Sequence, residues 1–509
     1  MKLAEFQKRN PILFNALTFH KNHKGEYLDF ENYPYLRGIY ADASRNLGIM
    51  KATQCGASEY AVVRDFALAM AGFNVFHVLP TDRILTRYVK ERFDKSLFFT
   101  PEYGGAIRTN SVTMKQVDKG TISFVSSNST ANFTEFPADD AIIDENDQCD
   151  QDNIKMVEDR LANSTRRSTY IVGNPTITDF GIHARFKQSK QYMWHIKCPK
   201  CGQWYHPEFL THAVEQVDDN VWTYKDHEWQ QTDARDPFMF HDCGEPINRK
   251  QDGKWIAMNP GAQDSYYHIG KEFSTQVSMR ELCAAFSRGL DNEAEMQRFY
   301  NSDLGLPYTQ KGSFISVDEL NAAVREFPRV LSCRSPCVCG IDVGNSLHTV
   351  VNHILPDGSE RVVFIGELKT LEDIKQLCIR FNIISGVIDA MPEIRMAREV
   401  SAFRKWYRCE FHSAKSFDKI EMRHIADGKK AMVNRTEILD AVATKIREQR
   451  LLLPRDAASI PDFYRHITAL TRVFNETRQE YNWVGERADH YLFALAYATV
   501  ARRITGISV

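Results

Sequence analysis

The chain contains 509 residues, of which 43% are hydrophobic and 26% are charged, and its formal net charge is −2. No apolar run approaches the ~20 residues that a membrane-spanning helix needs, and residues 1–10 lack the apolar core of a signal peptide. We therefore expect no membrane span and a cytoplasmic location. Eleven irregularly spaced cysteines in a chain this long do not indicate a disulfide framework.

Residues 1–45 form a polar and aromatic N-terminal segment, and residues 46–190 then alternate short apolar runs with helical stretches, as in an α/β domain. The first part of this domain predicts a strand at Leu47–Met50, a helix with one apolar face, and a second strand at Asn74–Leu79. A strand, a tight turn, a helix and another strand are the setting of a phosphate-binding loop.

The turn reads Lys-Ala-Thr-Gln-Cys-Gly-Ala-Ser over residues 51–58. In the usual G-x-x-x-x-G-K-[ST] pattern, backbone N–H groups and a lysine hold phosphates, and the hydroxyl reaches Mg²⁺. Here Lys51 stands at the first glycine position and Ala57 at the usual lysine position, whereas Gly56 and Ser58 keep theirs. The pattern is compatible with a lysine that acts from the front of the loop, and a plain strand–turn–helix with a surface lysine is the alternative.

Two further strand ends carry polar residues that suit such a site. Ala141–Ile143 is an apolar strand followed by Asp144 and Glu145. An ATPase needs one carboxylate for Mg²⁺ and a second to orient the attacking water, and ligands bind at the carboxyl ends of parallel strands. A purely acidic loop is the alternative. Another strand ends at Gly173–Thr176, which either contacts the γ-phosphate or forms a plain turn.

Residues 191–310 are rich in Trp, Tyr and His and read as an insertion that returns to the first domain. A Cys-Pro-Lys-Cys-Gly knuckle at 198–202 is half of a zinc site. The sequence His-Asp-Cys-Gly at 241–244 offers the other half, with Phe240 where a cysteine would complete a pair. His206 is a rival ligand, and a metal-free remnant with three free thiols is the alternative. The predicted zinc ligands are Cys198, Cys201, His241 and Cys243.

The last part of the chain predicts a linker at 311–336, with a helix at Val317–Phe327, and a second domain at 337–509. A strand ends near Asp342, a hairpin turn follows at 356–358, a later strand ends at Asp389, and Asp489 opens the last helix. This order suits an RNase H-like nuclease core. Three such carboxylates can hold two metal ions about 4 Å apart, one to activate water and one to stabilise the leaving oxygen. Any one of these aspartates alone is more commonly structural.

From about residue 30 to 505 the order of these motifs resembles the large terminase subunit of tailed phages, in the branch like that of phage lambda. The motifs that carry the resemblance are Lys51–Ser58, Ile143–Glu145, Gly173–Thr176, Cys198–Gly202, Trp255–Pro260, Phe299–Tyr308, Gly340–Asp342, and Asn434–Arg435 leading to Leu453–Pro454. Two features depart from the family. The second cysteine pair is incomplete, and Asp489-His490 stands where many relatives have paired acids.

The resemblance implies an α/β protein with an N-terminal P-loop (RecA/ASCE-like) ATPase domain, a zinc-knuckle-like insertion and a C-terminal RNase H-like nuclease domain. It implies a motor that drives double-stranded viral DNA into a procapsid and cuts concatemers. The implied nucleotide-binding residues are Lys51, Thr53, Gln54, Cys55, Gly56, Ala57, Ser58 and Asp144. Glu145 is the implied general base. Asp342, Asp389 and Asp489 are the implied catalytic metal ligands, and Arg160, Arg166 and Arg167 are candidates for an arginine that contacts phosphate.

The implied cofactors are ATP with Mg²⁺, Mg²⁺ or Mn²⁺ at the nuclease site, and Zn²⁺. The implied partners are the portal protein, the small terminase subunit and further copies of this chain in a ring, with a monomer in isolation as the alternative state. The implied location is the host cytoplasm and not the mature virion. Ala57 supports a rival function, an RNase H-like nuclease or recombinase with a non-hydrolysing DNA-binding front half. A helicase-like remodeller with an inactive nuclease fold is a third.

Overall fold

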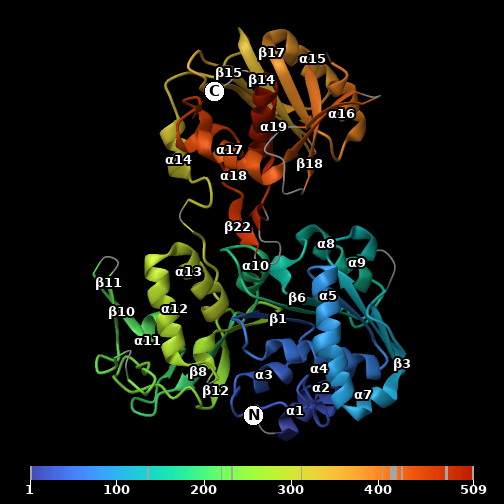
Figure 1. Ribbon diagram of the computed structural model, residues 1–509, viewed down its shortest axis with the longest axis vertical. Coiled ribbons are helices and arrows are strands. Elements are labelled where there is room, and N and C mark those ends of the chain that lie inside the picture. Colours follow the sequence, from blue (N-terminus) through green and yellow to red (C-terminus); the bar gives the residue numbers. More distant parts are fainter. Residues whose placement is uncertain are drawn as a thin grey trace. The chain divides into compact units, whose positions relative to one another are not determined.

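In a computed structural model the chain divides into two compact units, Met1–Gln310 and Lys311–Val509, which we call unit 1 and unit 2 (Figure 1). Within the described residues no helix combines the length and apolar character needed to cross a bilayer. The structure describes residues 3–133, 137–218, 221–230, 233–274, 276–310, 312–344, 346–403, 405–412, 421–425, 428–475, 480–485 and 487–506.

Unit 1 is built on one large sheet with the strand order β12-β8-β13-β1-β7-β6-β2-β5-β4-β3, and β9 pairs with β8. The neighbours from β8 through β13, β1, β7, β6 and β2 to β5 are parallel, whereas β12, β4 and β3 join antiparallel. The strands are β1 (Asn46–Lys51), β2 (Asn74–Leu79), β3 (Ile107–Asn110), β4 (Met114–Val117), β5 (Gly120–Ser126), β6 (Asp140–Asp144), β7 (Ser168–Gly173), β8 (Tyr192–Lys197), β9 (Trp204–Tyr205), β12 (Gly253–Ala257) and β13 (Ser265–Ile269), with a separate hairpin of β10 (Val214–Asp218) and β11 (Val221–Tyr224).

The helices of unit 1 supply the apolar side chains that cover this sheet. The helix α4 is buried along most of its length, and its buried residues include the charged Glu59, Arg64 and Asp65 as well as its apolar side chains. The helices α12 and α13 pack against each other at the end of the unit (Figure 1). The bounds are α1 (Leu3–Arg9), α2 (Pro11–Leu17), α3 (Leu36–Tyr40), α4 (Ala57–Met70), α5 (Asp82–Tyr88), α6 (Asp94–Phe99), α7 (Pro101–Ala106), α8 (Gln151–Lys155), α9 (Val157–Leu161), α10 (Gly181–Gln188), α11 (Phe209–His212), α12 (Met279–Asp291) and α13 (Glu293–Arg298), with π-helical turns η1 (Val89–Phe93) and η5 (Phe299–Leu304).

The region after residue 190 is part of the same sheet. The strands β8 and β12 lengthen it at one edge, and β13 lies directly beside β1, with Gly48 paired to Tyr266. A glycine is needed at position 48 because a Cβ there would lie 2.2 Å from the Tyr266 ring. The strand that carries the loop lysine is therefore flanked by β7 on one side and by a strand from the later region on the other.

Unit 2 has an eight-stranded sheet with the order β19-β20-β18-β17-β14-β15-β16-β21. The first three of its strands in chain order, β14, β15 and β16, form an antiparallel meander, and β17, β18 and β20 then add in parallel. The expected hairpin turn at 356–358 joins β15 to β16. The strands are β14 (Cys333–Val343), β15 (Leu347–Ile354), β16 (Glu360–Leu368), β17 (Phe381–Asp389), β18 (Trp406–His412), β19 (Glu421–Ile425), β20 (Gly428–Asn434) and β21 (Leu451–Leu452), with a hairpin of β22 (Thr471–Asn475) and β23 (Glu480–Val484).

The last helix of unit 2 packs directly on the first strand of its sheet. Gly340 makes this contact close, since a Cβ at this position would lie 2.0 Å from the carbonyl oxygen of Ala494. The helix α19 also packs against α17 and α18, which lie beside it in Figure 1. The helices are α14 (Val317–Ala323), α15 (Leu371–Arg380), α16 (Ile394–Ser401), α17 (Arg435–Arg447), α18 (Phe463–Ile467) and α19 (His490–Ile504).

One helix is shorter than the sequence indicates. The helix expected at Val317–Phe327 ends at Ala323, because Val324 turns to extended backbone and forms a parallel bridge with Leu453. Ile315 and Leu320 are fully buried in the core of unit 2. The segment that precedes β14 therefore packs as part of this unit.

Candidate functional sites

The loop after β1 has the backbone of a phosphate-binding turn. Gln54 and Gly56 adopt positive φ angles of 59° and 83°, and α4 begins at the next residue, Ala57. Such a reversal turns successive backbone N–H groups toward one concave side, in front of the positive end of the helix dipole. The buried hydroxyl of Tyr35, from the N-terminal segment, donates a hydrogen bond of 3.1 Å to the carbonyl of Cys55 and fixes the loop from behind.

Lys51 is the point at which three strand ends meet. Its Nζ donates to Oε1 of Glu145 at 3.0 Å and to Oδ1 of Asn174 at 2.9 Å, and the residue is only 4% exposed. Burial lowers the pKa of Lys51, but the carboxylates of Glu145 and Asp144 outweigh this effect and raise it above the usual value. The lysine is therefore a buried, charged donor at the carboxyl edge of the sheet, and the surface-lysine alternative is wrong.

The two acids after β6 have different surroundings. Asp144 is 5% exposed, and burial, with the charge of Glu145 next to it, raises its pKa. Glu145 has a positive φ of 53°, an uncommon backbone for a residue with a side chain. This conformation turns its carboxylate away from the strand direction and toward Lys51. Asp144 is thus placed to hold a cation, whereas Glu145, with 30% of its side chain exposed, can contact water.

A later segment, η5, bonds to both the loop and the end of β7. The carbonyl of Ser302 accepts from the backbone N–H of Thr53 at 2.9 Å and from its hydroxyl at 3.0 Å. The side chain of Asn301 donates to the carbonyl of Thr176 at 2.9 Å, and its own carbonyl accepts from Asn174 at 3.3 Å. These contacts link the loop at residues 51–58, the turn after β7 and η5, close to the end of unit 1. Sequence reasoning missed them, although Asn301 lies in the motif at Phe299–Tyr308.

Asp147 holds the turn after β7 in place. Its carboxylate accepts from the backbone N–H and the hydroxyl of Thr176, both at 2.9 Å, and from the backbone N–H of Ile182 at 2.7 Å. Burial raises the pKa of Asp147 to about 6 in spite of these hydrogen bonds. Asp147 therefore connects the acidic strand to the turn after β7 and to the start of α10.

The arginines near this site differ in their partners. Arg166 pairs with the buried Asp140 at 3.5 Å, and Arg167 donates to the carbonyl of Ser164 at 2.9 Å, so both brace the turn before β7. The structure adds an arginine that sequence reasoning did not consider. Arg92 pairs with Glu59 at 3.4 Å, and its charge opposes in part the rise that burial and Glu145 cause in the pKa of Asp144.

The two cysteine-containing turns at 198–202 and 241–244 come together. The ligand atoms of Cys198, Cys201, His241 and Cys243 all lie within 4.8 Å of one another. The Sγ atoms of Cys198 and Cys243 are 3.5 Å apart, near the ~3.7 Å expected for two sulfurs each 2.3 Å from one tetrahedral zinc ion. His206, the rival ligand, instead makes a 2.7 Å hydrogen bond to the carbonyl of Trp194. The four residues fit a closed metal centre.

In unit 2, the predicted aspartates lie at the ends of adjacent elements. Asp342 is near the end of β14, and Asp389 ends β17, which is its parallel neighbour. Burial and the nearby charge of Asp342 raise the pKa of Asp389 to about 7. Asp489 precedes the first residue of α19; burial raises its pKa as well, Arg435 opposes this, and Asp342 adds to it. The charge of Asp342 therefore acts on both of the other carboxylates.

Two histidines lie against Asp342 that sequence reasoning did not assign. Nδ1 of His490 is 2.9 Å from Oδ2 of Asp342, and the ring of His348 stacks on that of His490 with centroids 4.5 Å apart. Ligand atoms of Asp342, His348 and His490 lie within 4.8 Å of one another. The register of the first hairpin, which pairs Asp342 with His348, was the available signal.

Comparison with known families agrees with this geometry. A family model described as the ATPase domain of the phage terminase large subunit gpA matches residues 22–259, and one described as the endonuclease domain of the terminase large subunit gpA matches residues 265–351. Together they cover well over half of the chain. The chain belongs to the phage terminase large subunits. It therefore carries the ATPase and endonuclease domains of a DNA-packaging motor, and the rival without an ATPase is not favoured.

One solved structure, that of a phage large terminase, shows the same fold at a TM-score above 0.5. The large terminase of bacteriophage HK97 is 11% identical and matches over 94% of this chain and 95% of its own, with a TM-score of 0.52. The large terminase of a thermophilic bacteriophage is also 11% identical, over 91% of this chain and 94% of its own, with a TM-score of 0.32. No curated protein matches the chain. The endonuclease family model ends at residue 351, so it includes Asp342 and His348 but not the later acids.

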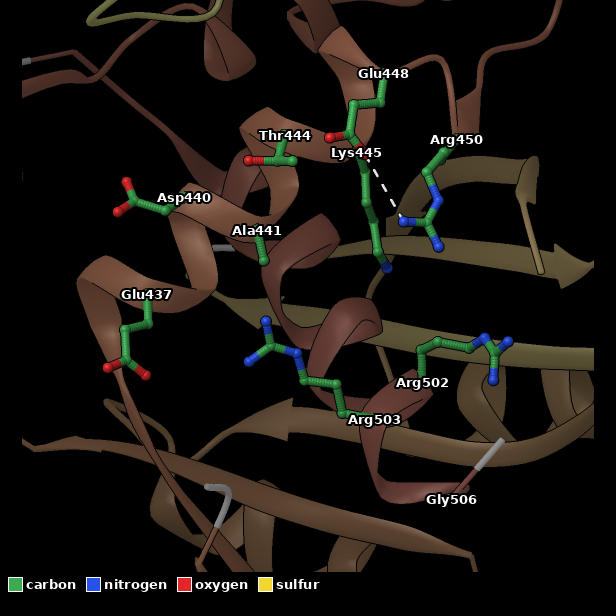
Figure 2. A pocket seen from close by; sticks show the side chains of 10 residues that line it. All are labelled: Glu437, Asp440, Ala441, Thr444, Lys445, Glu448, Arg450, Arg502, Arg503 and Gly506. Atoms are coloured by element: carbon green, nitrogen blue, oxygen red, sulfur yellow. Dashed lines mark ion pairs between the residues drawn. The ribbon is translucent and has the colours of Figure 1, made fainter. Parts of the chain in front are cut away.

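The terminase also has a pocket of about 660 Å³ in unit 2, lined by α17, the end of α19 and the turns that follow them (Figure 2). The lining mixes both signs of charge. Lys445 pairs with Glu360 at 2.5 Å, and Arg450 pairs with Glu448 at 3.7 Å. None of the candidate catalytic residues is among the ten that line this pocket, so it is separate from the acidic site.

Proposed function

We propose that unit 1 hydrolyses ATP through a phosphate loop whose lysine acts from the front. In this proposal Lys51 and the backbone of residues 53–58 hold the β- and γ-phosphates, and Ser58 and Asp144 hold Mg²⁺. Glu145 is the general base that orients and deprotonates the attacking water. The observation that supports these roles is the pair of contacts from Lys51 to Glu145 and Asn174, at 3.0 and 2.9 Å.

Asn174 and Thr176 contact the γ-phosphate side in this proposal. Loss of the γ-phosphate changes the partner of Lys51, and the hydrogen bonds of Asn301 carry that change from the turn after β7 to the end of unit 1. This gives hydrolysis a direct mechanical output, because the chain continues from η5 toward unit 2. Arg92 joins Arg160, Arg166 and Arg167 as a candidate to stabilise charge on the phosphates.

The acidic site of unit 2 is the proposed endonuclease centre. Asp342, Asp389 and Asp489 hold divalent metal, Mg²⁺ or Mn²⁺. When bound, two such ions activate water and stabilise the leaving oxygen of a phosphodiester. The chain places the three carboxylates at the ends of neighbouring elements, with Asp342 buried and Asp389 and Asp489 partly buried, and the negative charge of Asp342 acts on both of the other acids. Contacts to phosphate carry no base information, so this centre alone cuts without sequence preference.

The knuckle in unit 1 is the proposed zinc site, with Cys198, Cys201, His241 and Cys243 as its ligands. A closed set of three thiolates and one imidazole is the ligand chemistry of structural zinc. Zinc bound there stabilises the two turns and leaves no open position for substrate.

The proposed partners are double-stranded viral DNA, a portal protein, a small terminase subunit and further copies of this chain in a ring. A packaging motor works where concatemeric DNA meets procapsids, so we propose the host cytoplasm as its location and absence from the mature virion. The support for these partners is the family membership and the presence of both enzymatic domains in one chain.

The test is a separation of the two activities in the full chain. Asp342→Asn should abolish metal-dependent cleavage of plasmid DNA and leave DNA-stimulated ATP hydrolysis intact. The matched control is Asp357→Asn, in the exposed hairpin turn of the same sheet, which should change neither activity. Loss of ATP hydrolysis with cleavage retained would reverse the assignment of the two units.

A further inference from the structure

The acidic site of unit 2 contains nitrogen ligands as well as oxygen ligands. Asp342 and His348 are directly opposite each other in the antiparallel pair β14–β15. Opposed residues of such a pair point to the same face of the sheet, with Cβ atoms about 4.5–5.5 Å apart. His490, the first residue of α19, enters from the helix that packs on β14. Three elements thus deliver one carboxylate and two imidazoles to one point.

The surroundings of these side chains restrict them to that point. Asp342 and His348 are 6% and 7% exposed. A backbone hydrogen bond with Ser346 acts on the ring of His348, whose Nδ1 is buried. Its Nε2 is 3.8 Å from a carboxylate oxygen of Glu367. A histidine that binds a metal ion through one ring nitrogen commonly bonds a backbone group or a carboxylate through the other, so these neighbours suit a metal ligand.

We propose that Asp342, His348 and His490 form the ligand set of one divalent ion, and that this set selects a borderline transition metal over Mg²⁺. The inference rests on the proposed nuclease function and gives the identity of one of its ions.

The selectivity follows from ligand chemistry. Mg²⁺ strongly prefers oxygen ligands in octahedral geometry and gives up water reluctantly. An imidazole nitrogen suits first-row transition ions, and two histidines with one carboxylate are a typical set for them. Asp389 and Asp489 remain as oxygen ligands for a second ion, so the two positions differ in the metal ion that they prefer.

The experiment measures Mn²⁺ binding to the full chain without nucleotide, from the electron paramagnetic resonance signal of free Mn²⁺, with Mg²⁺ as competitor. Mn²⁺ is chosen because the thiolates of the knuckle bind it poorly. The variants are His490→Asn, His348→Asn and His490→Asp. The matched control is His353→Asn. His353 is a partly buried histidine of β15, five residues after His348, so its side chain lies on the opposite face of the sheet.

We expect His490→Asn and His348→Asn to raise the dissociation constant of Mn²⁺ at least about ten-fold, and the control to leave it unchanged. A ten-fold loss of metal affinity is the lower limit typical of mutations in residues that only support a metal ligand. His490→Asp should keep Mn²⁺ binding and let Mg²⁺ compete at least about ten-fold better, because the set becomes richer in oxygen. This gain also shows that a change at position 490 leaves the fold intact.

Wild-type Mn²⁺ binding by His490→Asn, or unchanged Mg²⁺ competition in His490→Asp, would overturn the inference. If Asp342→Asn abolishes cleavage in that case, the nuclease proposal still stands with an all-aspartate site. If Asp342→Asn cuts DNA normally, the nuclease proposal itself fails.

Discussion

Replacing Glu145 by glutamine separates nucleotide binding from hydrolysis. The Glu145 carboxylate is 3.0 Å from Nζ of Lys51. Glutamine keeps an oxygen at that distance and almost the same volume, so the loop should keep its shape. The change removes one negative charge and the basicity of the group. A water molecule can still enter the site, but it has no group to take its proton.

General-base catalysis contributes about 10²–10⁴-fold to a rate, which corresponds to about 3–5 kcal/mol in the activation free energy. We expect ATP hydrolysis to fall by this factor. Nucleotide affinity should equal or exceed that of the wild type, because Lys51 loses an anionic neighbour and its charge turns to the phosphates. Steady-state phosphate release and titration with a fluorescent ATP analogue measure the two quantities.

The matched control is Glu91→Gln, which removes a carboxylate that pairs with Lys95 at 2.5 Å on the exposed side of unit 1. An exposed pair of this kind contributes little, so both quantities should stay at wild-type values. If Glu145→Gln hydrolyses ATP within about three-fold of the wild type, a loss far below the range for a general base, Glu145 is not the base and the reasoning is refuted.

Three other changes test separate parts of the structure. Asn301→Ala should lower DNA-stimulated hydrolysis about ten-fold with nucleotide affinity retained, since it removes the side-chain bond to the carbonyl of Thr176 in the turn after β7 and the bond to the carbonyl of Leu306, each worth about 1 kcal/mol; unchanged stimulation would exclude the link. Cys201→Ser should release bound zinc, measured by a chromogenic chelator, and lower the melting temperature of unit 1, whereas Cys333→Ser should do neither. Burial raises the pKa of Glu272 from 4.5 to about 8. Between these two pH values the folded protein keeps a proton that the unfolded chain loses, so the free energy of unfolding falls as the pH rises from 4.5 to about 8. The melting temperature of Glu272→Gln relative to wild type should therefore increase from pH 6 to pH 8.5, and a constant difference would contradict the raised pKa.

The convergence of Lys51, Glu145 and Asn174 could be predicted because it depends on local pattern and strand direction. Each follows a short apolar run that reads as a strand, and parallel strands bring their carboxyl ends to one edge of the sheet. The contacts from Asn301 and Ser302 could not be predicted. They join residues far apart in the chain, and a polar residue in a π-helical turn carries no local signal of its partner.

The same limit explains β13. The place of Ser265–Ile269 beside β1 depends on the path of the whole region between the two strands. His348 is a different case, since the pairing of Asp342 with His348 follows from the antiparallel pairing of the neighbouring Val343 with Leu347. A search restricted to carboxylates overlooked the imidazoles. The early end of α14 also has a cause in the tertiary structure, because Val324 forms a bridge with Leu453 instead of continuing the helix.

The most direct test of the central claim is steady-state ATP hydrolysis by the wild type and by Lys51→Ala, each with and without double-stranded DNA. Lys155→Ala, at an exposed lysine of the same unit, is the control. We expect DNA-stimulated hydrolysis by the wild type and the control, and a loss of at least about 100-fold in Lys51→Ala, in line with the loss of one charge-stabilising donor. Hydrolysis by Lys51→Ala at the wild-type rate would contradict a loop in which the front lysine holds the phosphates.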